Sequence, residues 1–153
     1  YLALWCGIAN GAEDILLPEK YDYDEQRIIN NIIDNRKKGK KHHIIINAEG
    51  IGHSQAMAKR IEAATGIETR ATILGHMQRG GTPTCKDRVY ASIMGAKAVD
   101  ILLEGKTKRV ICYRDGEYID MDINEALAMK KSISEYQYEV SYSLSHNYSK
   151  NNQ

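Results

Sequence analysis

The sequence of 153 residues contains no phenylalanine, two prolines, one tryptophan and three cysteines. Cys6, Cys85 and Cys112 are odd in number and far apart, so they offer neither metal-ligand spacing nor a disulfide framework. This usage favours a reducing compartment, and we expect a cytoplasmic protein. No apolar run reaches the roughly 18 residues of a membrane span, and we expect no contact with a membrane.

An excess of charge of one sign is also missing, because 21 Lys and Arg residues stand against 20 Asp and Glu residues. Proteins that bind nucleic acids usually carry a strong basic excess, so we expect no nucleic-acid partner. The length suffices for one domain with a sizeable core. The chain opens on Tyr1 without a methionine, and apolar structure starts at once, so we expect a truncated sequence.

Helical and strand-like patterns alternate along the first two thirds of the chain. Helices are expected within residues 2–9, 25–38, 57–64 and 84–103, and strands at residues 15–17, 43–47 and 67–74. The first helix is apolar on all sides, as a buried helix would be. Asp22 stands three residues before Glu25 in a capping-box-like start, and Thr84 with Asp87 forms another. The alternation predicts an α/β fold with a mostly parallel sheet flanked by helices.

The last third predicts a hairpin and one further helix. Residues 108–113 and 117–121 flank an Asp-Gly pair that is typical of a tight turn. The helix starts near Asn124, and the apolar residues from Ile133 to Leu144 extend it. We expect one domain over residues 1–146 and a fraying polar tail over residues 147–153.

The densest set of chemically active residues lies in the segment TRATILGHMQRGGTPT, residues 69–84. Arg70 falls within the expected strand, and His76 and Arg79 follow its end. In open α/β sheets, ligands bind beyond the carboxyl ends of strands. The planar guanidinium of arginine matches phosphate oxygens, and histidine adds a donor. These residues therefore suggest a phosphate or sugar-phosphate site; solvated arginines on a glycine turn are the alternative.

Two further candidates follow from position and charge. Glu49 follows the strand at residues 43–47, where its carboxylate could accept hydrogen bonds from sugar hydroxyls, or could be an ordinary loop acid. The run RKKGKKHH, residues 36–43, is either a solvated helix end or an anion-binding site. Glu13 could stand near this run.

The segment TRATILGHMQRGGTPTCKDRVYASIMGAKAVDILLEG resembles the C-terminal signature of ATP-dependent 6-phosphofructokinases of the bacterial type. GIANGAEDILLPE and GKKHHIIINAEGIG are similar to segments that this family carries in the same order. The resemblance extends from about residue 1 to residue 131, and LGHMQRGG is its most specific stretch. It implies part of the phosphofructokinase fold.

The resemblance also implies a reaction and a set of binding residues. These enzymes transfer the γ-phosphate of ATP, with Mg²⁺, to the 1-hydroxyl of fructose 6-phosphate in glycolysis, and they act as homotetramers. The residues that match the family's sugar-phosphate site are Glu49, Arg70, His76, Met77, Gln78 and Arg79, of which Arg70 would reach a neighbouring subunit's substrate. The residues that match its effector site, for ADP-like or phosphoenolpyruvate-like ligands, are Gly11, Ala12, Glu13, Lys38, Lys40, Lys41 and His42. Glu13 would also stand near the Mg²⁺ of a bound nucleotide.

The family's glycine-rich ATP loop, catalytic aspartate and Met-Gly-Arg substrate motif do not occur in this sequence. We therefore expect no catalytic residue in the chain, and no activity from the chain alone. A pyrophosphate-dependent phosphofructokinase and a non-catalytic sugar-phosphate-binding module are the alternatives.

Overall fold

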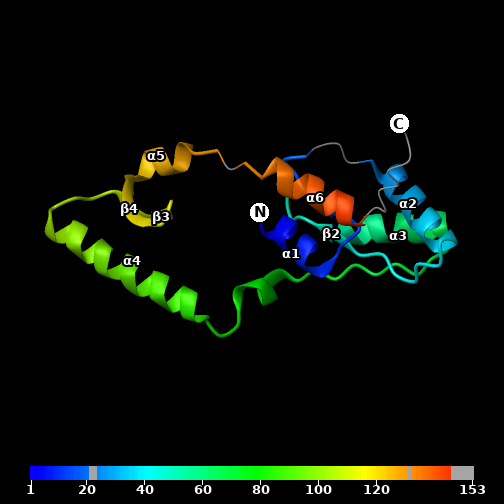
Figure 1. The fold of residues 1–153 in the computed structure, drawn as a ribbon, viewed down its shortest axis with the longest axis horizontal. Coiled ribbons are helices and arrows are strands. Elements are labelled where there is room, and N and C mark those ends of the chain that lie inside the picture. Colours follow the sequence, from blue (N-terminus) through cyan, green and yellow to red (C-terminus); the bar gives the residue numbers. More distant parts are fainter. Residues whose placement is uncertain (21–23, 131, 146–153) are drawn as a thin grey trace. The chain divides into compact units, whose positions relative to one another are not determined.

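A computed structural model describes residues 1–20, 24–130 and 132–145. The chain divides into two compact units, one formed by Tyr1–Ile73 and the segment from Ser132, the other by Leu74–Lys131 (Figure 1). The expected cap at Asp22 and the expected tail at residues 147–153 lie outside the described residues.

The first unit is built around two parallel strands, β1 (Asp14–Leu16) and β2 (Ile45–Asn47), which pair Ile15 with Ile46. Between them runs α2 (Glu25–Lys37), and α3 (Ser54–Thr65) follows β2. The unit also contains α1 (Leu2–Asn10) and α6 (Glu135–Ser145). A β-α-β crossover with helices around a parallel pair confirms the expected α/β class.

Alternation along β1 separates two apolar clusters, because successive side chains of a strand point to opposite faces. Leu16 packs with buried residues of α2 and α3, among them Ile28 and Ile61. Ile15 and Leu17 pack instead with Leu4 of α1, and Tyr138 of α6 packs against this second cluster. The sheet is therefore covered by α2 and α3 on one face and by α1 and α6 on the other.

The second unit contains a short 3₁₀ helix η1 (Gly75–Arg79), the long helix α4 (Cys85–Leu103), the strands β3 (Arg109–Arg114) and β4 (Glu117–Asp122), and α5 (Ile123–Ala128). The two strands form the expected antiparallel hairpin. Its turn residues Asp115 and Gly116 both have positive φ, 54° and 91°, as a type I′ turn requires. Tyr90 of α4 packs against Tyr113 and Tyr118 of the hairpin.

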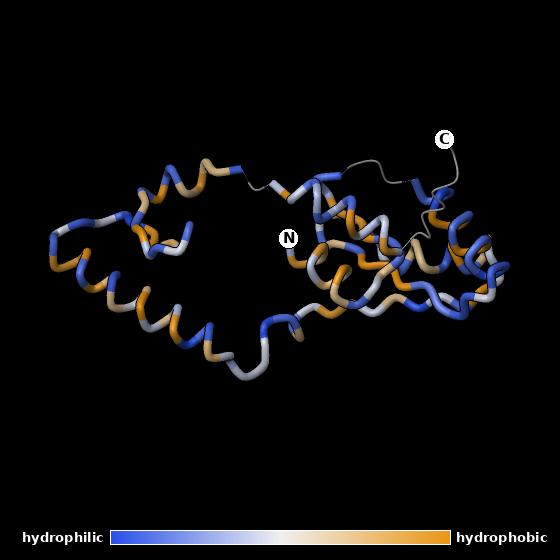
Figure 2. The backbone as a smooth tube through the Cα atoms, in the orientation of Figure 1, coloured by the Kyte–Doolittle hydropathy of each residue, from blue (hydrophilic) through white to orange (hydrophobic). Residues whose placement is uncertain are grey.

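Helix α4 begins with the predicted capping box, in which the Thr84 hydroxyl accepts from the Asp87 N–H and the Asp87 carboxylate accepts from the Thr84 N–H. Apolar residues recur along this helix (Figure 2), but of the residues of α4, all of which are described, only Ile101 is buried. Val99 and Leu103 are 55% and 82% exposed, because the hairpin covers a small part of the helix surface.

Three sequence expectations were wrong. Residues 67–74 form no strand, because neither two-stranded sheet pairs with them. Helix α1 is not buried on all sides, since Trp5 is half exposed. The last helix is two helices: α5 ends where Met129 turns to an extended backbone, and α6 begins anew, with the Ser134 hydroxyl accepting from the Gln137 N–H. No helix within the described ranges is long and apolar enough to cross a membrane.

Candidate functional site

The loop that carries Glu49 leaves the carboxyl end of β2. The Ala48 N–H donates to the Leu16 carbonyl at 3.0 Å, and the Ile51 N–H donates back to the Ala48 carbonyl at 3.0 Å. These bonds form a tight turn whose tip exposes Glu49. The carboxylate therefore stands at a strand end, where a ligand could reach it.

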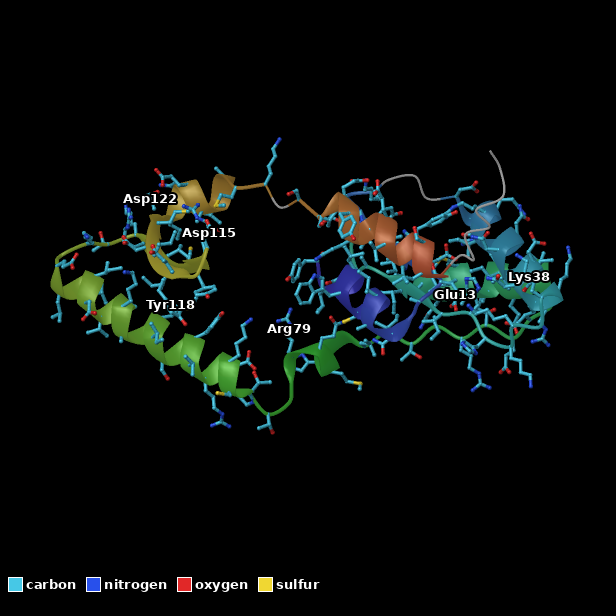
Figure 3. All side chains as sticks on the ribbon, in the orientation of Figure 1. Glu13, Lys38, Arg79, Asp115, Tyr118 and Asp122 are labelled. Atoms are coloured by element: carbon cyan, nitrogen blue, oxygen red, sulfur yellow. The ribbon has the colours of Figure 1, made fainter. Side chains whose placement is uncertain are left out.

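The candidate residues His76, Met77, Gln78 and Arg79 form η1 in the second unit and are all exposed. Gly75 begins this turn with a φ of 51°, and Gly81 follows it with a φ of 108°. Both values lie in the left-handed region that favours glycine, so the sequence Gly-His-Met-Gln-Arg-Gly-Gly bends sharply and presents its side chains outward. Arg79 (Figure 3) is thus available to an anion, and so is the equally exposed His76.

Arg70 lies in the first unit and is 83% exposed at its side chain. Its guanidinium bonds to the Glu68 carboxylate, with Nε at 2.8 Å from Oε1. An exposed pair of this kind is weak and exchanges readily for another anion. Glu49 and Arg70 thus belong to one unit, and residues 76–79 to the other.

Among the candidate effector residues, Glu13 follows the left-handed turn at Gly11 and is only 4% exposed. Its Oε2 accepts from the Ile44 N–H at 2.5 Å, and its Oε1 pairs with Lys40 Nζ at 2.5 Å. Burial alone raises the pKa of Glu13, but the Ile44 N–H and the Lys40 ammonium outweigh it and hold that pKa below its ordinary value. The carboxylate is therefore ionised at neutral pH.

Of the candidate basic residues, Lys40 pairs with this carboxylate. The side chains close to Lys40 in the sequence, Lys38, Lys41 and His42, are exposed. Lys38 ends α2 (Figure 3) and Gly39 adopts a φ of 88°, so the chain turns between the two lysines. Both oxygens of Glu13 are already engaged. Among the described residues there is no group of three His, Cys, Asp or Glu side chains that could by itself hold a metal ion.

Sequence reasoning missed the residues next to Glu13. Asp14 is 3% exposed, with Oδ2 at 2.9 Å from His43 Nε2 and Oδ1 at 3.8 Å from Arg27 Nη2. Two consecutive acids at the start of a short apolar strand were the signal, because buried carboxylates need partners. These contacts join β1 to α2 and to His43, next to the candidate effector residue Glu13.

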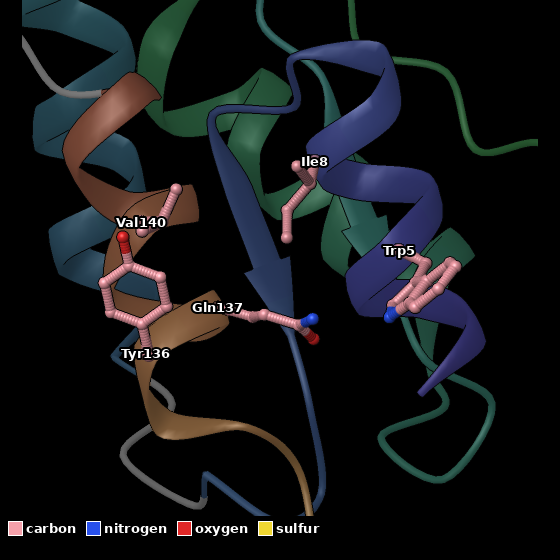
Figure 4. Close-up of a pocket in the computed structure, with 5 residues that line it drawn as sticks. All are labelled: Trp5, Ile8, Tyr136, Gln137 and Val140. Carbon is pink, nitrogen blue, oxygen red and sulfur yellow. The ribbon is translucent and has the colours of Figure 1, made fainter. Parts of the chain in front are cut away.

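A second missed feature is an apolar cavity of about 220 Å³ between α1 and α6 (Figure 4). It is lined by Trp5, Ile8, Tyr136, Gln137 and Val140. None of the predicted site residues contributes to it, and its lining carries no charge.

Three comparisons with known proteins agree with one another. The phosphofructokinase family model matches residues 1–102. An ATP-dependent 6-phosphofructokinase of Clostridium botulinum (strain Loch Maree / Type A3) is 49% identical over 144 residues, and ATP-dependent 6-phosphofructokinase 1 of Clostridium perfringens (strain 13 / Type A) is 54% identical over 143 residues. Each match covers 94% of this chain and 45% or 44% of the relative, so the chain spans less than half the length of these relatives.

The solved structure of phosphofructokinase from Saccharomyces cerevisiae resembles the chain with a TM-score of 0.69 and 30% sequence identity. That match covers 94% of this chain and 20% of the yeast chain. A match over 94% of the chain is longer than residues 1–131, to which the sequence motifs extended. The similarity therefore continues into α6.

Proposed function

Since the chain belongs to the phosphofructokinase family, we propose that it is the C-terminal, ligand-binding part of an ATP-dependent 6-phosphofructokinase of the cytoplasm. The longer protein that this proposal requires is called the full-length enzyme below. It transfers the γ-phosphoryl group of ATP to the 1-hydroxyl of fructose 6-phosphate, giving fructose 1,6-bisphosphate and ADP. Mg²⁺ accompanies ATP and neutralises phosphate charge.

The observation that carries the proposal is the exposed turn η1, in which His76 and Arg79 lie between Gly75 and Gly80, within the residues that the family model matches. Arg79 binds the 6-phosphate through its planar donors, and His76 adds one more. Glu49 accepts hydrogen bonds from sugar hydroxyls, and Met77 and Gln78 also contact the sugar phosphate. Arg70 reaches the sugar phosphate of a neighbouring subunit in a homotetramer.

The chain's part in the reaction is to bind and orient the sugar phosphate. The sugar oxygen attacks the γ-phosphorus, the bond to the ADP oxygen breaks, and the hydroxyl proton passes to a base that this chain does not supply. Positioning of this kind is a large share of phosphoryl-transfer catalysis. The residues Gly11, Ala12, Glu13, Lys38, Lys40, Lys41 and His42 form an effector site for an ADP-like or phosphoenolpyruvate-like anion.

The test is an activity assay on the full-length enzyme, produced from the gene that encodes this chain. Fructose 1,6-bisphosphate should form with ATP and Mg²⁺, whereas the 153-residue chain alone should form none. Product formed only with pyrophosphate would favour a pyrophosphate-dependent enzyme instead. A gene whose initiator methionine lies at or near the codon for Tyr1 would favour a non-catalytic sugar-phosphate-binding module.

A further inference from the structure

The side chain of Asn47, the last residue of β2, bridges the two ends of the loop that carries Glu49. Its Nδ2 donates to the Gly52 carbonyl at 2.8 Å and to the Ser54 hydroxyl at 2.8 Å. Gly52 ends the loop and Ser54 begins α3. A carbonyl oxygen only accepts hydrogen bonds, so the contact with Gly52 fixes which end of the amide faces the loop.

The other end of the amide, its oxygen, does not explain why an asparagine occupies this position. Asn47 Oδ1 is buried and has no hydrogen-bond partner among the described residues. A buried acceptor without a donor destabilises the folded state, and an apolar side chain at a strand end would avoid that loss. What the asparagine contributes is therefore its pair of donor bonds to the loop.

The loop needs such a restraint because its backbone is unusual. Gly52 and His53 are consecutive left-handed residues, with φ of 70° and 53°, and His53 is not a glycine. A non-glycine residue in this region is strained and persists only where its surroundings hold it. Asn47 bonds to Gly52, the first residue of this kink, and to Ser54, the residue directly after it, so the amide spans the kink.

The start of the loop is fixed independently. A Cβ on Gly50 would lie 2.6 Å from Cγ of Pro18, so the backbone lies directly against that ring. Together with the Ala48 N–H bond to Leu16, this contact fixes the start of the loop. At its exit, the side-chain hydrogen bonds to β2 among the described residues are those of the Asn47 amide.

We propose that Asn47 is a positioning residue that holds the Glu49 carboxylate in the direction from which it meets the sugar hydroxyls. The inference rests on the proposed function, in which Glu49 contacts fructose 6-phosphate. A loop that is already ordered loses less conformational freedom when the sugar binds, so its restraint improves affinity without touching the ligand.

A double-mutant cycle in the full-length enzyme tests this. Asn47→Leu keeps the approximate shape of the side chain and removes both donor bonds. It should raise the KM for fructose 6-phosphate about three- to tenfold, the range that one lost neutral hydrogen bond covers. The change in kcat should be smaller. In a Glu49→Ala background the same substitution should add nothing, because the group that it positions is gone.

Two further variants make the outcome decisive. Asn47→Asp keeps the shape but sets an acceptor against the Gly52 carbonyl, so it should raise KM as well. Asn10→Leu is the matched control, since Asn10 Nδ2 also donates to a backbone carbonyl, that of Cys6 at 2.8 Å, and it should leave KM unchanged.

An equal rise in KM from Asn47→Leu with and without Glu49 would overturn the inference. An unchanged KM in Asn47→Leu would overturn it as well, and so would loss of folding in both Asn47 variants. If Glu49→Ala itself leaves the sugar KM unchanged, the proposed sugar site is wrong, which is a separate outcome.

Discussion

At the scale of single residues, Glu13 carries a strongly constrained charge. Its side chain is buried. The Ile44 N–H and the Lys40 ammonium hold its pKa below the ordinary value of 4.5, and Lys40 itself is about one-third exposed. A carboxyl group whose pKa is lowered by folding stabilises the protein above its unfolded pKa. That stabilisation is lost as the pH falls through the folded pKa.

Glu13→Gln should therefore lower the free energy of unfolding by about 1–3 kcal/mol at pH 7. The difference from the unsubstituted chain should shrink below about pH 4, as the native carboxylate is protonated. Urea unfolding at pH 7, 5, 4 and 3 measures this. Glu68→Gln is the control, since the Glu68–Arg70 pair is exposed and should matter little. A difference that stays constant with pH would contradict the assignment.

The lysines around Glu13 should govern regulation in the full-length enzyme. Replacing Lys38 and Lys40 by Ala should abolish the shift that an ADP-like effector produces in the sugar-phosphate saturation curve, and kcat should change little. An effector shifts an equilibrium only through its different affinities for two states, typically by about 1–3 kcal/mol. Lys59→Ala, a change at an exposed lysine of α3, should preserve the response. An unaltered shift in the double variant would leave both lysines without a regulatory role.

At the scale of elements, the start of α2 has a defined cap. Asp24 accepts from the N–H groups of Gln26 at 3.0 Å and Arg27 at 3.2 Å. Because α2 covers one face of the sheet, Asp24→Ala should destabilise the chain by about 1 kcal/mol, which thermal unfolding can measure. Asp34→Ala, an exposed change in the same helix, should cost less. Equal losses from the two substitutions would show that the cap is unimportant.

Elements defined by local chemistry could be predicted from the sequence. The isoleucines of α2, the capping box of α4 and the Asp-Gly turn of the hairpin each carry a local signal, and the structure contains all three. Residues 67–74 have the composition of a strand, yet a strand requires a partner, and the described sheets provide none. The break before α6 was missed because apolar spacing continued across it.

The same division holds for the candidate sites. The residues of η1 and Glu49 could be named from motifs, because a motif is a local property. The partners of Asp14, which are His43 and Arg27, depend on how β1, β2 and α2 pack. The bonds of Asn47 depend on the left-handed backbone at Gly52 and His53. No sequence spacing reports either arrangement.

At the scale of the whole molecule, the chain spans less than half the length of its relatives, and the residues proposed to bind the sugar phosphate come from both units. Glu49 and Arg70 lie in one unit, and His76 and Arg79 in the other. The central claim is that these residues bind fructose 6-phosphate and do not bind the phosphoryl donor.

Steady-state kinetics of Arg79→Ala in the full-length enzyme test that claim most directly, with both substrates varied. Loss of a charge-assisted contact of about 1.5–3 kcal/mol should raise the KM for fructose 6-phosphate about ten- to a hundredfold. The KM for ATP should stay near its original value. Arg114→Ala, which removes an exposed arginine from β3, should change neither constant. A rise in the KM for ATP with an unchanged KM for fructose 6-phosphate would contradict the account.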